Sequence, residues 1–148
     1  MQVEITMEKT SMTCEAYIEN LDRVLGFVEE CAERFGLSDK RKIDLMLAVE
    51  EAFVNVCHYA YTGREGDVEF VCFGEGDSFV VEIADKGVAF NVLTLPDPDT
   101  SADVMERKIG GLGVFFIRKM TDDLSYRRED GRNILRMVLR SHNSDKKS

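Results

Sequence analysis

The order of the periodic segments constrains the fold most: helical patterns fill the first half of the sequence, and most strand patterns fill the second. Apolar residues recur at helical spacing from about residue 13 to 35, and Gly36 follows where a left-handed C-terminal cap is favoured. Ser38 offers an N-cap oxygen, so a second helix is predicted from there to about Tyr61. Two consecutive helices argue against an alternating, doubly wound fold.

The later strand patterns come as hairpins. Gly74–Asp77 joins one pair of runs, and Asp130-Gly131 joins the last pair. Since the two helices can cover only one face of the resulting sheet, we expect an α+β two-layer sandwich, with helices packed on one face of a mostly antiparallel, mixed sheet. The predicted strands are residues 2–8, 68–73, 79–84, 124–128 and 132–140, and a short apolar helix is predicted at 112–120.

Charge and length narrow the class of protein. The chain has 148 residues, with 19 basic and 28 acidic side chains and a net charge of −9. Such a chain is poorly suited to nucleic acid or an anionic membrane, and it has no signal-peptide pattern or long apolar span. We therefore expect one soluble, cytoplasmic domain over residues 1–143, a polar tail at 144–148, and four cysteines that serve as reduced core thiols.

The second predicted helix carries a carboxylate and a carboxamide, Glu51 and Asn55, in an otherwise apolar stretch. Four residues span about 40° around a helix, so both side chains share a face. A lone pair of this kind most often faces solvent, but polar groups inside so apolar a helix need partners. An amide oxygen suits Mg²⁺, and a nearby carboxylate can accept a proton from a hydroxyl or from water.

A second candidate element follows the third predicted strand. Asp85 and Gly87 could form only a turn. As the alternative, the Asp85 carboxylate, which only accepts hydrogen bonds, could bind an exocyclic amino group such as that of adenine. Guanine carries its amino group elsewhere on the ring.

Glycines form the third candidate element. Gly110, Gly111 and Gly113 stand at the start of the short apolar helix, where free N–H groups and the helix dipole favour phosphate, although a flexible hinge is the alternative. Neither of the two standard phosphate-binding motifs fits these glycines. Residues 91–109 are predicted to form a long loop, and loops of this length are more often functional than idle.

These three elements together resemble the nucleotide boxes of GHKL (Bergerat-fold) ATPases. The boxes are Glu51-x-x-x-Asn55, Asp85-x-Gly87-x-Ala-Phe90 and Gly110-Gly-Leu-Gly113. Within that superfamily the chain resembles the small anti-sigma-factor serine/threonine kinases of bacteria. The sequence segments on which this second resemblance rests are residues 50–61, 96–100 and 110–119.

The resemblance implies a Mg²⁺-ATP pocket between helices and sheet. It assigns Glu51 as the catalytic base, Asn55 to the metal and Asp85 to the adenine amino group. Residues 91–109 become the lid, and Asn133 stands near adenine, where the family often has a small hydroxyl residue. The full nucleotide-binding set implied is Asn55, Asp85, Gly87, Phe90, Gly110, Gly111, Leu112, Gly113 and Asn133.

The function implied is that of a stand-alone regulator, since we expect neither a phospho-accepting helix nor further domains in this sequence. As a serine/threonine kinase it would phosphorylate an antagonist protein, sequester a sigma factor and form a homodimer. Two alternatives stay open: a non-catalytic switch that binds ATP, and a simple Mg²⁺-ATPase in which water is the acceptor.

Overall fold

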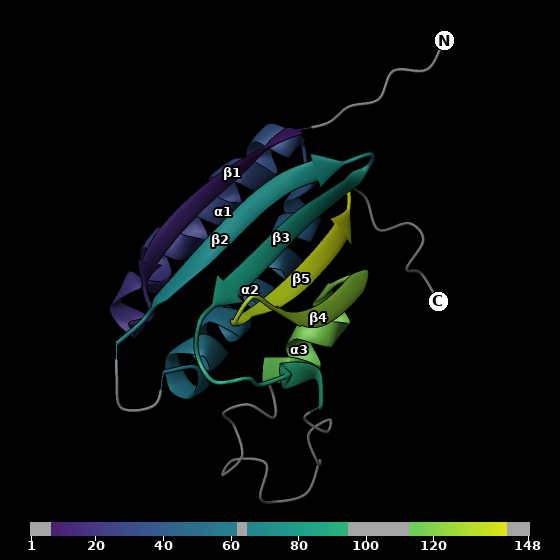
Figure 1. Ribbon diagram of the computed structural model, residues 1–148. Helices are drawn as coiled ribbons and strands as arrows, with labels where there is room; N and C mark the ends of the chain where they lie inside the picture. Colours follow the sequence, from purple (N-terminus) through teal and green to yellow (C-terminus); the bar gives the residue numbers. More distant parts are fainter. Residues whose placement is uncertain (1–6, 62–64, 95–112, 142–148) are drawn as a thin grey trace, which may run out of the picture.

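The computed structural model describes residues 7–61, 65–94 and 113–141 (Figure 1). The described part begins with a strand, continues with two helices, and then alternates hairpins with short helical segments. In chain order the elements are β1 (Met7–Glu15), η1 (Ile18–Asn20), α1 (Leu21–Phe35), α2 (Asp39–Tyr59), β2 (Asp67–Glu75), β3 (Ser78–Asp85), η2 (Val92–Thr94), α3 (Gly113–Met120), β4 (Asp123–Glu129) and β5 (Arg132–Arg140).

The described strands form one sheet in the order β1-β2-β3-β5-β4, with β1 and β4 at its edges. Every pairing between them is antiparallel, so this part of the chain lacks the parallel pair that a mixed sheet would contain. Both predicted hairpins are present. Asp130 and Gly131 join β4 to β5 with φ values of 54° and 75°, which match the right-handed twist of the flanking strands.

Helices α1 and α2 cover one face of this sheet (Figure 1). Apolar side chains from both helices and from the inward faces of β2, β3 and β5 form one core, which includes Val28, Phe53 and Phe70. Cys14, Cys31 and Cys72 are buried in it, as predicted. The α+β two-layer sandwich is therefore confirmed. In the part of the chain that the structure describes, no helix is long and apolar enough to cross a membrane.

The predicted start of the first helix is wrong. Residues 2–6 of the predicted N-terminal strand lie outside the described part; its last two residues are in β1, which continues to Glu15 and pairs with β2. Helix α1 begins at Leu21, about eight residues later than predicted. The inward residues of β1 are Thr10, Met12 and Cys14. Their hydrophobicity differs little from that of the outward residues between them, so the sequence shows no clear alternation of apolar and polar side chains. Its pairing with β2, and not its sequence pattern, makes this segment a strand.

Helix α2 begins as predicted, with the Ser38 hydroxyl accepting from the Arg41 amide at 3.2 Å. It ends at Tyr59, two residues early. Arg41 is only 2% exposed and its guanidinium contacts Asp44 at 2.6 Å and Asp122 at 2.7 Å. This ion pair ties the first turn of α2 to the segment before β4 and so fixes how the helix lies on the sheet.

Candidate functional site

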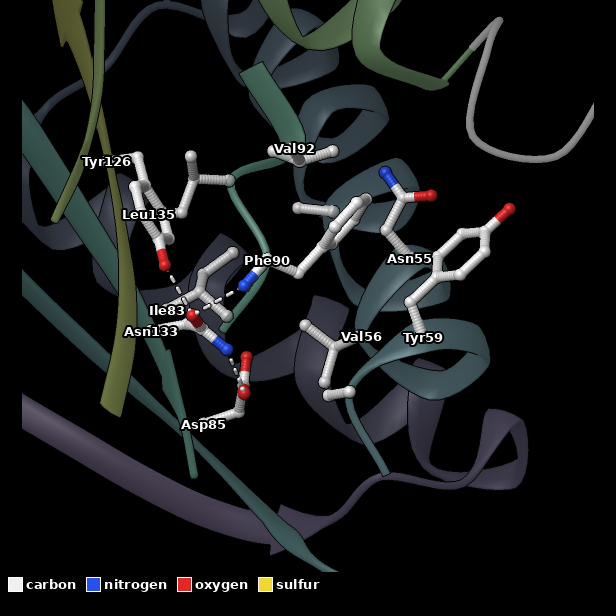
Figure 2. A pocket seen from close by; sticks show the side chains of 12 residues that line it. Asn55, Val56, Tyr59, Ile83, Asp85, Phe90, Val92, Tyr126, Asn133 and Leu135 are labelled. Carbon is white, nitrogen blue, oxygen red and sulfur yellow. Dashed lines mark hydrogen bonds between the residues drawn. The ribbon is translucent and has the colours of Figure 1, made fainter. Parts of the chain in front are cut away.

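A pocket opens between the C-terminal half of α2 and the inward face of β3, β5 and β4 (Figure 2). Three predicted site residues, Asn55, Asp85 and Asn133, supply its buried polar groups, and each is 7% exposed. Phe90, a fourth predicted residue, also lines it. The remaining lining residues are Ala52, Val56, Tyr59, Ala60, Ile83, Val92, Tyr126 and Leu135.

Asp85 ends β3 with one carboxylate oxygen fully engaged. Its Oδ1 accepts from the Gly87 amide at 2.8 Å and from Asn133 Nδ2 at 2.9 Å. Among the described residues no donor reaches the second oxygen, Oδ2. Because this oxygen has unused acceptor capacity, the site is suited to a ligand that brings an N–H group.

Asn133 faces Asp85 across the β3–β5 pairing and connects three segments. Its Nδ2 donates to Asp85 and, at 2.8 Å, to the Val88 carbonyl. Its Oδ1 accepts from the Tyr126 hydroxyl at 2.5 Å, the Phe90 amide at 3.2 Å and the Arg128 guanidinium at 3.1 Å. Figure 2 shows the bonds to Asp85, Tyr126 and Phe90 as dashed lines. All hydrogen-bonding groups of this amide are therefore occupied.

Asn55 lies across the pocket from Asp85, on α2 (Figure 2). Its Nδ2 is buried without a hydrogen-bond partner in the described part of the chain. An unsatisfied buried donor costs about 1–3 kcal/mol, which a bound ligand with an acceptor would offset. The helix thus presents an unpaired amide to the same pocket that holds the free oxygen of Asp85.

Glu51 lies one helical turn before Asn55 but does not line the pocket. The residue is half-buried, and no hydrogen bond or ion pair to it is found within the described ranges. Burial, and secondarily the charge of Glu50, raise the pKa of the Glu51 carboxyl above its usual value. Glu51 and Asn55 thus lie on one face of α2, as predicted, but the first residue of α2 that lines the pocket is Ala52.

Gly87 allows a close backbone approach, although the neighbour is protein. A Cβ atom at this position would lie 2.1 Å from the carbonyl oxygen of Ala60, the C-cap of α2. The adjacent Val88 amide donates to that same oxygen at 3.0 Å. The loop after β3 is therefore fixed against the end of α2, which positions Asp85 opposite the helix.

We expect Gly87→Ala to lower the free energy of unfolding by about 1–3 kcal/mol, because the new methyl group overlaps backbone that cannot move away easily. Gly26→Ala is the matched control. Gly26 lies inside α1 with nothing within 4 Å of the added Cβ, so this change should stabilise by about 0.5–1 kcal/mol. Urea denaturation of both variants measures the difference. Equal midpoints would contradict the packing role of Gly87.

Three further residues at the site, Tyr59, Tyr126 and Arg128, are not among those predicted from the sequence. The Tyr59 ring packs against Phe90 with centroids 5.4 Å apart, and Arg128 also donates to the Gly87 carbonyl at 2.9 Å. The sequence contains weak signals for these residues. Tyr59 follows Asn55 by one helical turn, and Tyr126 and Arg128 are two residues apart on one strand, which places them on the same face.

The glycine box falls largely outside the described residues. Gly110, Gly111 and Leu112 lie there, as does most of the predicted lid, while Gly113 begins α3. Described residues 91–94 contain Asn91 and the short η2. No group of three or more His, Cys, Asp or Glu side chains that could hold a metal occurs within the described ranges.

A family model described as the histidine kinase-like ATPase domain matches residues 14–139. This range covers most of the chain and contains every element from η1 to β4. The chain therefore belongs to the histidine kinase-like ATPase domain family.

Individual relatives are named more specifically. The chain is 27% identical to the serine-protein kinase RsbW of Bacillus mycoides over 132 residues, which cover 86% of this chain and 82% of the relative. It is 30% identical to the protein of that name from Listeria monocytogenes over 109 residues, covering 70% and 69%. These matches confirm the predicted resemblance to GHKL ATPases and to anti-sigma-factor kinases.

Proposed function

We propose that this protein is a Mg²⁺-ATP-dependent serine/threonine protein kinase that acts as an anti-sigma factor. The observation that carries the proposal is one pocket with an unpaired amide on Asn55 and an unpaired carboxylate oxygen on Asp85. Similarity to proteins named serine-protein kinase supports the reaction type.

The pocket residues fit a nucleotide. The Asp85 oxygen suits the amino group of adenine, and the apolar lining with Ile83 and Phe90 suits a flat ring. Asn55 has a buried amide whose oxygen suits a hard cation and whose nitrogen suits an acceptor. When bound, ATP supplies the phosphoryl group and Mg²⁺ offsets the charge of its phosphates.

In this proposal Glu51 is the general base. Its carboxylate would take the proton from the serine hydroxyl of the substrate protein, whose oxygen then bonds to the transferred phosphorus while ADP leaves. A raised pKa supports such a role, since a base works best when its pKa approaches the operating pH.

The raised pKa of Glu51 predicts where the transfer rate declines in acid. Only the deprotonated carboxylate accepts a proton, so kcat should fall as pH drops through a pKa above the usual glutamate value of about 4.3. Glu50→Gln removes the secondary cause of the shift and should move this acidic limb to lower pH. The measurement is kcat against pH for both proteins. An identical limb in wild type and Glu50→Gln would contradict the assignment.

A second candidate is an ATP-binding switch that transfers nothing. The position of Glu51 outside the pocket lining favours it, because a switch needs no base. A simple Mg²⁺-ATPase is the third candidate, with water in place of serine as the acceptor.

The proposed partners are a sigma factor, an antagonist protein that carries the target serine, and a second copy of this chain. All of them would meet in the cytoplasm. One experiment tests the proposal: radiolabelled γ-phosphate transfer from Mg²⁺-ATP to co-purified proteins, with partners identified by mass spectrometry. Label on a partner serine supports the kinase, label released as free phosphate supports the ATPase, and binding without turnover supports the switch.

A further inference from the structure

The position of Asp85 in the pocket depends on Asn133. Two donors, the Gly87 amide and the Asn133 amide, hold Oδ1 at 2.8 and 2.9 Å. Because two directed bonds fix one oxygen, rotation of the carboxylate is restricted and Oδ2 is the oxygen left to accept from a ligand. Removing either donor would release this restriction.

Asn133 itself has no group to offer a ligand. Its oxygen already accepts three bonds and both of its amide hydrogens are donated. The charge of Arg128 and the hydroxyl of Tyr126 polarise the amide, which strengthens its donation to Asp85. Its effect on a bound base must therefore pass through Asp85 and the loop that follows β3.

We propose that Asn133 is a positioning residue that gives the pocket its preference for adenine over guanine by holding Asp85 with one oxygen directed at the ligand. This inference rests on the proposed nucleotide binding. An acceptor held in place favours the 6-amino group of adenine and repels the 6-oxo group of guanine. A carboxylate free to rotate discriminates less.

Asn133→Asp is the sharpest variant, because it keeps the accepting oxygen and replaces only the donating nitrogen. The introduced carboxyl would face Asp85, with Arg128 and Tyr126 contacting it from β4. Two carboxylates this close cannot both ionise freely, so the pair should hold one proton at low pH and lose it as pH rises. With the proton, donation to Asp85 is restored; without it, the two charges repel each other.

Calorimetry with Mg²⁺-ATP and Mg²⁺-GTP from pH 5 to 9 tests the inference. For Asn133→Asp we expect ATP affinity, relative to wild type at the same pH, to fall by roughly 10- to 100-fold between the acidic and alkaline ends. Carboxyl ¹³C NMR without nucleotide should detect one proton held with a pKa above the ordinary aspartate range. Ser125→Asp adds the same charge on the exposed side of β4, and its relative affinity should not vary with pH.

Asn133→Ala provides a second test that does not depend on pH. It should lower the ratio of ATP to GTP affinity, whereas a purely structural role would weaken both nucleotides equally. An unchanged ratio in Asn133→Ala, or a pH-independent relative affinity in Asn133→Asp, would overturn this inference while leaving nucleotide binding intact. A wild-type protein that binds neither nucleotide would instead overturn the proposed function, and this inference with it.

Discussion

Glu51→Gln is expected to bind Mg²⁺-ATP like the wild type while phosphate transfer to a partner serine falls by roughly 10²- to 10⁴-fold. Glutamine keeps the size of the side chain but cannot accept the proton of the attacking hydroxyl. Because Glu51 lies outside the pocket lining, the change should leave the adenine contacts intact. Single-turnover transfer of labelled phosphate measures the rate, and calorimetry measures the affinity.

Two comparisons sharpen this test. Glu50→Gln changes the neighbouring carboxylate and should transfer phosphate at the wild-type rate at neutral pH. Whereas Glu51→Gln should slow phosphate transfer without changing affinity, Asn55→Ala should weaken the Mg²⁺-dependent binding of ATP itself. A Glu51→Gln protein that phosphorylates its partner as fast as wild type would refute the kinase mechanism, and the ATP switch would then be the better account of the pocket.

Asp85→Asn is expected to weaken ATP binding roughly 10²- to 10³-fold, because a hydrogen bond to a charged oxygen, worth about 1.5–3 kcal/mol, is lost and two donors then face each other. The fold should survive the change. The amide oxygen can take the place of Oδ1, which accepts from Gly87 and Asn133, while the new NH₂ group replaces Oδ2.

Selectivity separates this prediction from simple damage to the site. An NH₂ group at this position can donate to the 6-oxo group of guanine, so the preference for ATP over GTP should shrink or invert. Asp67→Asn makes the same charge change at an exposed position on β2 and should leave both affinities unaltered. Equal affinity of the wild type for ATP and GTP would contradict the assignment of Asp85 to adenine.

The two sets of variants correspond to two ends of the pocket. Asp85 and Asn133 lie on neighbouring strands of a rigid sheet, whereas Asn55 and Glu51 lie on α2, which packs across from it. Gly87 joins the ends, because its loop contacts the C-cap of α2 directly. In the proposed mechanism, base recognition and phosphate chemistry are therefore expected to be separable by mutation, even though one loop positions both.

The sequence by itself determined the types of most elements and four of the residues that line the pocket. Apolar periodicity predicted α2, and the turn residues predicted both hairpins, because these signals act between residues close in the chain. Asn55 is recognisable because it interrupts an apolar helix, and Asp85 because it stands at the end of an apolar strand. Resemblance to a family then added Phe90 and Asn133, which periodicity alone would not single out.

Tertiary structure decided the features that depend on contacts between distant residues. Asn133 meets Asp85 across 48 positions of sequence, and Arg41 reaches Asp122 across 81. The two faces of strand β1 differ too little in hydrophobicity for the strand to be predicted from sequence, and its pairing with β2 makes it a strand. The sequence predicts that Gly87 contacts a ligand, yet the atoms nearest to a Cβ placed there belong to the backbone of Ala60. In each case the deciding energy comes from packing and hydrogen bonding between segments that only the folded chain brings together.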